Sequence, residues 1–481
     1  MLSIGWLGGG LALATWAAGP GNPVDDVLLP KPPPPPGAES LPLVLRPAEK
    51  KPASRPAPRK DRRGVPSSLS KDAVILRPPS VRRTRFGPPP PRFVFQDEDR
   101  VVLLGELFQE ALPFGFLETR IVSQYPDRDL HFRNLGWPDK GLLALEKDGH
   151  PAPPLAGLFR AAEAFRPTVV LISLGKRDAI ARGDTNAFGA AFGRLLDRLS
   201  RLNGKDGTRL LVVSPSGYEP TPGALTNART ANDRLAAYVM QTYYAATNRQ
   251  ARFVNLFGFS IWDSTGLRKI AEQKQSTMRY YTDDGVTLNA FGFWRLTFGL
   301  ERALNWPFNT WRWGLMADNT FRDGGFGIDI LSYQRTDSEA KLTTKARRLP
   351  TPNPAGFVDR EPETKPQCYI QLPGLRPGLY ELRVDDRPVL RGDHEEWARY
   401  EVISAGPDWI QADKLRRAVV AKNQRVQEWL RRFADPDARQ AAEAAITKAE
   451  EEIFRLRMPV QRVYHIVRVG DAPPGKDKKR R

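Results

Sequence analysis

Cysteine and histidine are scarce in this sequence of 481 residues. Cys368 is the single cysteine, so neither an intramolecular disulfide nor a cysteine-based metal cluster can form. The four histidines lie far apart and form no histidine-rich metal motif: His131, His150, His394 and His465. Apolar runs long enough to cross a bilayer are also absent after residue 96. We therefore expect a protein without a metal ion or another cofactor, and without a transmembrane helix in its globular part.

The first 96 residues lack the composition of a folded domain. Residues 1–92 hold 20 of the 44 prolines, in runs that favour extended polyproline geometry and bury little apolar surface. We predict a disordered basic linker over residues 20–96. Residues 1–19 resemble a signal peptide or a short anchor, although the first basic residue is Lys31. This pattern favours export to the periplasm or cell envelope; without a functional signal the protein is cytoplasmic.

The net charge of +18 raises the question of a polyanionic partner. Residues 1–92 contain 15 basic and 6 acidic residues, and residues 466–481 contain 6 and 2, so these two ends supply 13 of the 18 charges. The globular remainder is only mildly basic, which argues against a specific nucleic-acid-binding domain. The ends are either solubilising segments or arms that contact polyanions of the cell envelope.

Between residues 97 and 305 the sequence alternates apolar strands with amphipathic helices. Strands are predicted at 101–105, within 129–137, and at 167–175, 209–217 and 251–258. The run PTVVLISLG is continuously apolar, which is typical of a parallel strand covered on both faces. We therefore predict a three-layer α/β/α domain with a parallel, flavodoxin-like sheet, and expect its chemistry beyond the carboxyl ends of the strands.

After residue 305 this alternation ends. Short strands separated by glycine and proline turns predict a small β-rich module at 306–409. Residues 410–465 predict a helical hairpin and a final strand, and the many charged residues of the hairpin indicate an exposed pair of helices. We predict a basic disordered tail at 466–481.

Four segments at strand ends, taken together and in order, resemble the motif blocks of the SGNH/GDSL hydrolase family. They are VVLLGELF at 101–108, FRNLGW at 132–137 with ISLGKRDA at 172–179, and TDDGVTLNAFGFW at 282–294. The sequence is most similar to exported, multidomain members of the planctomycete type. The resemblance implies an SGNH-like fold and ester hydrolysis. In that reaction a serine attacks the acyl carbon, a histidine three residues after an aspartate is the base, and a glycine amide and an asparagine bind the oxyanion.

The side chains that carry this chemistry are largely replaced. Leu107 stands at the serine position, Arg177 at the asparagine position and Thr287 at the histidine position, whereas Gly136 and Asp284 are retained. A hydroxyl nucleophile without a base is scarcely activated. We therefore predict a catalytically inactive relative that acts as a binding or scaffold protein at the cell envelope. The alternative is an active hydrolase of acyl or acetylated-carbohydrate esters with a rearranged site.

Five charged residues near the same strand ends are candidates for ligand binding: Glu106, Lys176, Arg177, Asp178 and Asp283. Their carboxylates either converge for acid/base work or are ordinary solvated groups. Arg177 either grips a small anionic ligand or pairs with Glu106 or Asp178 and fills the vacated pocket. Carbohydrate is the other candidate ligand, and Trp397 and Tyr400 of the β-rich module form either a stacking face for it or part of a core.

Overall fold

The computed structural model describes residues 93–222, 224, 227–274, 277–355 and 368–471. The predicted signal or anchor, most of the predicted linker and the last ten residues of the predicted tail lie outside the described residues. The linker prediction extends too far at its end, because Phe95 is fully buried and packs against Tyr125 and Trp306. Within the described part of the chain, no helix combines the length and the apolar character needed to cross a membrane.

Five parallel strands form the sheet of the α/β domain, in the order β2-β1-β5-β6-β7. They are β1 Arg100–Gly105, β2 His131–Gly136, β5 Val169–Ser173, β6 Arg209–Val213 and β7 Arg252–Val254. Each coincides with a predicted strand segment, which confirms the parallel α/β class. In this flavodoxin-like order, β2 is added on one side of β1 and β5 on the other. Ligands of such sheets bind beyond the carboxyl ends of the strands at this switch point between β1 and β5.

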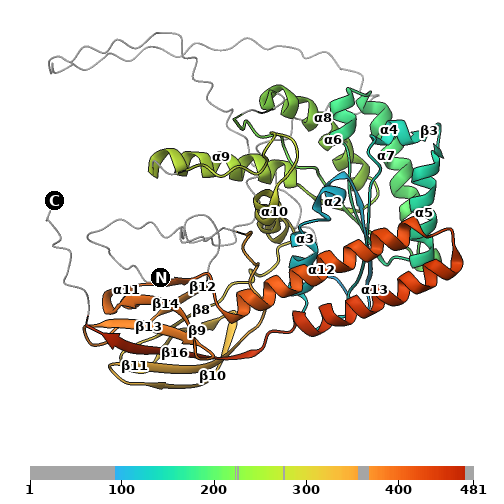
Figure 1. The fold of residues 1–481 in the computed structure, drawn as a ribbon. Coiled ribbons are helices and arrows are strands. Elements are labelled where there is room, and N and C mark those ends of the chain that lie inside the picture. The colour runs from blue at the N-terminus through green and yellow to red at the C-terminus, as the bar shows by residue number, and fades with distance from the viewer. Residues whose placement is uncertain (1–92, 223, 225–226, 275–276, 356–367, 472–481) are drawn as a thin grey trace, which may run out of the picture. The chain divides into compact units, whose positions relative to one another are not determined.

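Helices cover both faces of the sheet (Figure 1). They are α2 Glu106–Ala111, α3 Phe116–Gln124, α4 Leu142–Leu145, α5 Pro153–Phe165, α6 Lys176–Ala181, α7 Thr185–Leu199, α8 Ala228–Thr247, α9 Leu256–Lys274 and α10 Ala290–Ala303. Side chains alternate between the two layers along each strand: Val102 and Leu104 pack with α5, α7 and α8, whereas Val101 and Leu103 pack with α3 and α10. A short 3₁₀ turn at Gly204–Asp206 and a small hairpin of β3 Glu146–Lys147 and β4 His150–Pro151 complete the domain.

The chain after α10 forms a β sandwich of two sheets. One has the order β10-β11-β16-β13-β14 and the other β15-β12-β8-β9. The elements are β8 Arg312–Leu315, β9 Phe321–Phe326, β10 Ile328–Arg335, β11 Glu339–Ala346, β12 Cys368–Gln371, β13 Leu379–Val384, β14 Arg387–Asp393, α11 His394–Ala398, β15 Glu401–Ile403 and β16 Gln461–Gly470. Trp397 is fully buried in the shared core, whereas Tyr400 is partly exposed beside Tyr369. Trp397 is therefore a core residue and forms no stacking face.

The last strand corrects two predicted boundaries. β16 pairs with β11 and β13, so it belongs to the sandwich and not to the hairpin. It continues to Gly470, five residues past the predicted end, because it stays paired with β11 as far as Val467 and with β13 as far as Gly470. Residues 466–470 are therefore part of a sheet and not of a disordered tail.

The helical hairpin packs against the α/β domain, which corrects the prediction of exposed helices. It consists of α12 Pro407–Arg431 and α13 Pro436–Arg457. Leu415 and Val419 join the core on one face of the sheet, and Val426 and Trp429 join the core on the other. These residues form a stripe at three- and four-residue spacing, which the surrounding charged residues conceal in the sequence.

Polar side chains of the hairpin satisfy backbone groups of β2, the edge strand of the parallel sheet. Glu450 accepts from the Phe132 amide at 3.3 Å, and Lys422 donates to the Phe132 carbonyl at 3.3 Å. Gln427 donates to the Asn134 carbonyl at 2.8 Å. An uncovered edge strand is a template for wrong strand pairing, so the hairpin protects the domain from aggregation at this edge.

His131 at the start of β2 makes this contact sensitive to pH. Its Nδ1 lies 3.2 Å from Glu450 and its Nε2 lies 3.4 Å from Glu98, while Arg133 binds the other oxygen of Glu450. The hydrogen bond to Glu450 raises the pKa of His131 above its ordinary value of 6.5, although burial opposes the shift. A raised folded-state pKa means that the protonated form stabilises the fold. This contribution is complete below pH 6.5 and is lost as the pH rises through the raised pKa.

We therefore expect His131→Gln to lower the free energy of unfolding more at about pH 5.5 than at about pH 9. Urea unfolding of both proteins at the two pH values measures this difference. A deficit of equal size at both pH values would contradict the charge contribution and leave only a packing role for the ring, which contacts Phe454.

Candidate functional site

Glu106, the first residue after β1, is bound to the backbone of the neighbouring loop. Its side chain is 2% exposed, and its Oε2 accepts from the amides of Lys176 at 2.9 Å and Arg177 at 3.1 Å. Burial raises the pKa of this carboxyl to about 7, against the lowering effect of these hydrogen bonds. The carboxylate thus ties the start of α6 to the end of β1 and occupies the switch point of the sheet.

Leu107 stands where the family resemblance requires the nucleophile. Its side chain is 3% exposed and packs in the apolar core with Phe108 and Leu103. It therefore faces the protein interior and offers no reactive group. Gly105 before it adopts φ 118° and ψ 176°, a conformation that is open almost only to glycine.

The backbone amide of Gly136, expected to bind an oxyanion, is already satisfied within the protein. It donates to the Asn134 side chain at 3.1 Å, and the next amide, that of Trp137, donates to the Gln109 side chain at 3.2 Å. The positive φ of 63° at Gly136 also explains the glycine. The sequence does not predict these roles of Asn134 and Gln109, because nothing in the local pattern distinguishes the two residues from ordinary polar residues.

The three charged residues at the start of α6 point in different directions. Asp178 is buried and accepts from the amides of Leu142 at 2.7 Å and Leu143 at 3.0 Å, so it fixes the start of α4. The Arg177 guanidinium pairs with exposed Asp139. This corrects the expectation that Arg177 pairs with Glu106 or Asp178 and fills the pocket: its side chain turns outward, and only its amide meets Glu106.

Lys176 is buried between two loops at the carboxyl end of the sheet. Its side chain is 4% exposed, and its Nζ donates to Ser216 Oγ at 3.3 Å and to the Val286 carbonyl. The ring of Tyr218 lies 5.3 Å from the same nitrogen. Burial lowers the pKa of this amine below its ordinary value, despite nearby carboxylates that act in the opposite direction. Lys176 therefore bridges the loop after β6 and the loop before α10, a role that no sequence pattern indicates.

Asp284, retained from the motif, holds a turn. Its Oδ1 accepts from the amides of Val286 at 2.8 Å and Thr287 at 2.6 Å. Burial opposes ionisation of this carboxyl, but these hydrogen bonds lower its pKa below the ordinary value. Thr287 is exposed. The aspartate therefore supports the shape of the loop and orients no base.

The candidate carboxylates do not converge. Glu106, Asp178 and Asp284 are each directed at backbone amides of a different segment, and Asp283 accepts from Asn289 at 2.7 Å. Among the described residues there is no group of three or more His, Cys, Asp or Glu side chains that could hold a metal ion. The candidate carboxylates thus form neither an acid and base pair with one another nor a cluster.

An open cleft of about 440 Å³ lies beside the Asp284 turn. Its walls come from the loop after β6 and from the segment before α10, and it is lined by Thr221, Pro222, Arg279, Tyr280, Thr282, Asp283, Asn289 and Phe291. Asp283 is the one predicted ligand residue in this lining.

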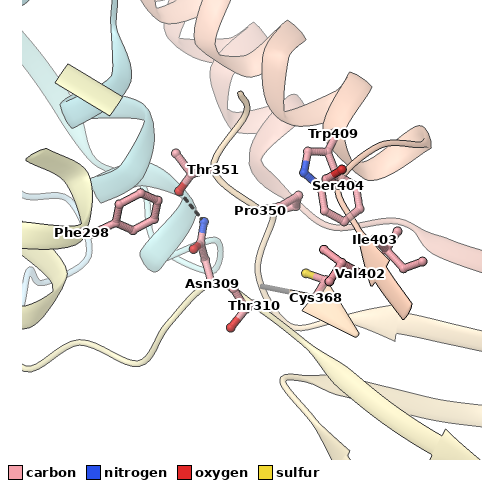
Figure 2. Close-up of a pocket in the computed structure, with 10 residues that line it drawn as sticks. All are labelled: Phe298, Asn309, Thr310, Pro350, Thr351, Cys368, Val402, Ile403, Ser404 and Trp409. Atoms are coloured by element: carbon pink, nitrogen blue, oxygen red, sulfur yellow. Dashed lines mark hydrogen bonds between the residues drawn. The ribbon is translucent and has the colours of Figure 1, made fainter. Parts of the chain in front are cut away.

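A second cavity, shown in Figure 2, holds only about 30 Å³. It lies between α10 and the sandwich, where Asn309 donates to Thr351 at 2.8 Å, and Cys368 and Trp409 also line it. Such a volume suits one water molecule and not an organic ligand.

Comparisons with known proteins address the fold. No protein-family model and no curated protein matches the sequence. A gut microbial diltiazem-metabolizing enzyme is similar in structure, with a TM-score of 0.60 over 78% of this chain and 99% of its own, at 13% sequence identity.

Two smaller structures match less of the chain. A putative GDSL-like lipase from Parabacteroides merdae covers 45% of this chain and 99% of its own, at 13% identity and a TM-score of 0.35. A catalytic mutant of an acetylxylan esterase from Geobacillus stearothermophilus covers 44% of this chain and 97% of its own, at 13% identity and a TM-score of 0.33. The described residues form a mixed α/β structure, in which a three-layer α/β/α domain with a parallel central sheet carries a β sandwich and a helical hairpin.

Proposed function

We propose that this protein is a catalytically inactive relative of the SGNH/GDSL ester hydrolases, and that it acts by binding as a scaffold at the cell envelope. One observation carries the proposal: the nucleophile position is a buried leucine in the core, Leu107. Nucleophilic ester hydrolysis needs a hydroxyl next to a base. Leu107 at the nucleophile position has no hydroxyl, and Thr287 at the histidine position is not a base at neutral pH.

The hydrogen bonds around the former centre support the same proposal. The Gly136 amide is paired with Asn134, and the buried Lys176 amine connects two loops where a substrate would need room. An oxyanion would have to displace these contacts, and stabilisation of the transition state depends on donors that are oriented in advance and unoccupied.

The cleft beside the Asp284 turn is the place where we propose that a small ligand binds. It combines the guanidinium of Arg279 and the carboxylate of Asp283 with the half-buried rings of Tyr280 and Phe291. A carbohydrate or a small anionic ligand suits such a lining, because aromatic faces contact sugar rings and a guanidinium binds hydroxyl, carboxylate or phosphate groups. The predicted export signal and the basic ends of the chain support a place at the cell envelope.

A second candidate function is ester hydrolysis by a different pair of residues. The 3.3 Å contact of Lys176 Nζ with Ser216 Oγ has the composition of a serine–lysine pair, and burial lowers the pKa of the lysine, which favours a neutral amine that can act as a base. However, Ser216 is 1% exposed and Lys176 is 4% exposed, so an ester does not reach them without rearrangement of the loops.

A fluorophosphonate probe, which labels activated serines covalently, separates the two candidates. We expect the intact mass of the full chain to remain unchanged after incubation with the probe. An adduct that forms on the wild-type protein and disappears in Ser216→Ala would contradict the inactive assignment and support the serine–lysine pair. The Ser264→Ala variant is a matched control, because Ser264 is a buried serine that donates to the Ile261 carbonyl within α9.

A further inference from the structure

The outer face of the sheet β10-β11-β16-β13-β14 carries a row of basic side chains. The strand registers pair Lys341 with His465 and His465 with Arg383, so three side chains on neighbouring strands stand side by side. Their chain neighbours point into the sandwich core: Leu342, Tyr464, Ile466, Leu382 and Val384. Side chains alternate along a strand, so the row points away from that core. Lys341 and Arg383 are exposed, and the His465 side chain is 25% exposed.

Basic groups outnumber acidic groups on this face. Lys345 lies on the same side of β11 as Lys341 and is exposed, and Arg391 stands opposite Glu381 on the neighbouring strand. Glu381 is 4% exposed and accepts from both Arg383 at 2.8 Å and Arg391 at 2.6 Å. One covered carboxylate is thus shared by two arginines that remain 44% and 66% exposed.

The other acidic groups near the row are already paired. Glu339 lies 2.7 Å from His465 Nε2, and Asp329 lies 2.9 Å from Arg347. Directly opposed positions in a sheet are stable when they hold apolar pairs or opposite charges, whereas this row has no carboxylate opposite Lys341 or Arg383. Lys341 therefore stands opposite Gln334 and His465 with no carboxylate, and Arg383 shares Glu381 with Arg391, so an external anion complements both residues.

The shape of the row favours a linear ligand. Neighbouring strands are about 4.8 Å apart, so Lys341 and Arg383, on the two strands that flank β16, stand about 10 Å apart along one direction. The row holds no Phe, Tyr or Trp side chain, and stacking on such rings is the usual means of holding the bases of single-stranded nucleic acid. We propose that this face binds a linear anionic polysaccharide, whose successive carboxylate or sulfate groups lie along Lys341, His465 and Arg383.

The row lies on the sandwich alone, so the proposed binding does not depend on whether the α/β domain is catalytically active. The strand β16, which carries His465, leads directly into residues 472–481, which contain five basic residues and one acidic residue. These residues are a second source of positive charge that the experiment has to separate from the sheet face.

Binding of the full chain to heparin, a sulfated polysaccharide, as a function of NaCl concentration tests the proposal. We expect Lys341→Gln/Arg383→Gln to weaken binding and to reduce the slope of log K against log salt by about two, since each removed contact accounts for about one unit. The matched control is Arg229→Gln/Lys448→Gln, which removes two exposed charges from α8 and α13. The control should bind as the wild type does, and both variants should keep the wild-type thermal unfolding temperature.

Three results would overturn the proposal. The first is an equal loss in the control variant, which would indicate non-specific attraction to net charge. The second is wild-type binding by the face variant together with loss of binding on deletion of residues 472–481. In the third, the face variant Lys341→Gln/Arg383→Gln binds heparin as the wild type does but no longer binds vesicles of equal parts phosphatidylglycerol and phosphatidylcholine. This result would show that the face binds a membrane surface.

Discussion

Lys422→Ala is expected to lower the free energy of unfolding by about 3–5 kcal/mol, because it leaves a buried carboxylate without its partner. The Lys422 Nζ lies 2.6 Å from Glu118 Oε1, and the two side chains are 0% and 3% exposed. The amine also donates to the Phe132 carbonyl of the edge strand at 3.3 Å. Truncation therefore removes an ion pair, an edge-strand contact and packing between α12 and α3. Urea unfolding monitored by circular dichroism measures the loss.

The double variant Glu118→Leu/Lys422→Met distinguishes the ion pair from packing. Replacement of both charges by apolar side chains of similar size is often neutral or stabilising, so we expect the double variant to be clearly more stable than Lys422→Ala. Lys448→Ala on the exposed side of α13 is the control, with an expected change within about 0.5 kcal/mol. If the double variant is no more stable than Lys422→Ala, the unpaired carboxylate of Glu118 is not the cause of the stability loss in Lys422→Ala.

Gly105→Ala is expected to lower the free energy of unfolding by about 3 kcal/mol or more. A Cβ at this position would overlap the backbone carbonyl of Ser173 on the neighbouring strand. The register of β1 and β5 pairs Gly105 directly with Ser173, so the obstacle is backbone held in a sheet and cannot move aside cheaply. The positive φ of 118° adds strain for any residue with a Cβ. The measurement is again equilibrium unfolding.

Gly157→Ala in α5 is the matched control. No atom lies within 4 Å of a Cβ placed there, and Gly157 lies inside a helix. Alanine should stabilise such a helix by about 0.5–1 kcal/mol. Opposite signs for the two substitutions would support a steric reason for the glycine in the first motif block. If both substitutions change the free energy of unfolding by similar small amounts, the backbone of Ser173 does not exclude a Cβ at Gly105.

The parallel sheet could be predicted because its strands are apolar on both faces. Val169 to Ile172, for example, are all buried, with alternate residues in the two cores. Such runs between amphipathic helices identify an α/β domain without knowledge of tertiary contacts. The glycines at 105, 136 and 175 also take positive φ, in agreement with their positions at turns.

Whether a charged side chain is buried or exposed could not be predicted in the same way. Lys176 and Lys422 are both buried, and no local pattern separates them from solvated lysines such as Lys448. The partner of Lys176, Val286, is more than 100 residues distant in the sequence. The partner of Lys422, Glu118, is more than 300 residues distant. Likewise, the strand at 461–470 could not be assigned to the sandwich, since its neighbours β11 and β13 are separated from it by the whole hairpin.

Turnover of p-nitrophenyl acetate by the full chain tests whether the α/β domain lacks the chemistry of an ester hydrolase, as we propose. The comparison proteins are Ser216→Ala and Asp284→Asn, purified in the same way and checked for wild-type unfolding. We predict a rate equal to that of buffer for all three proteins. A rate above buffer that falls in either variant while its fold is intact would contradict the claim and identify the residue on which a rearranged active site depends.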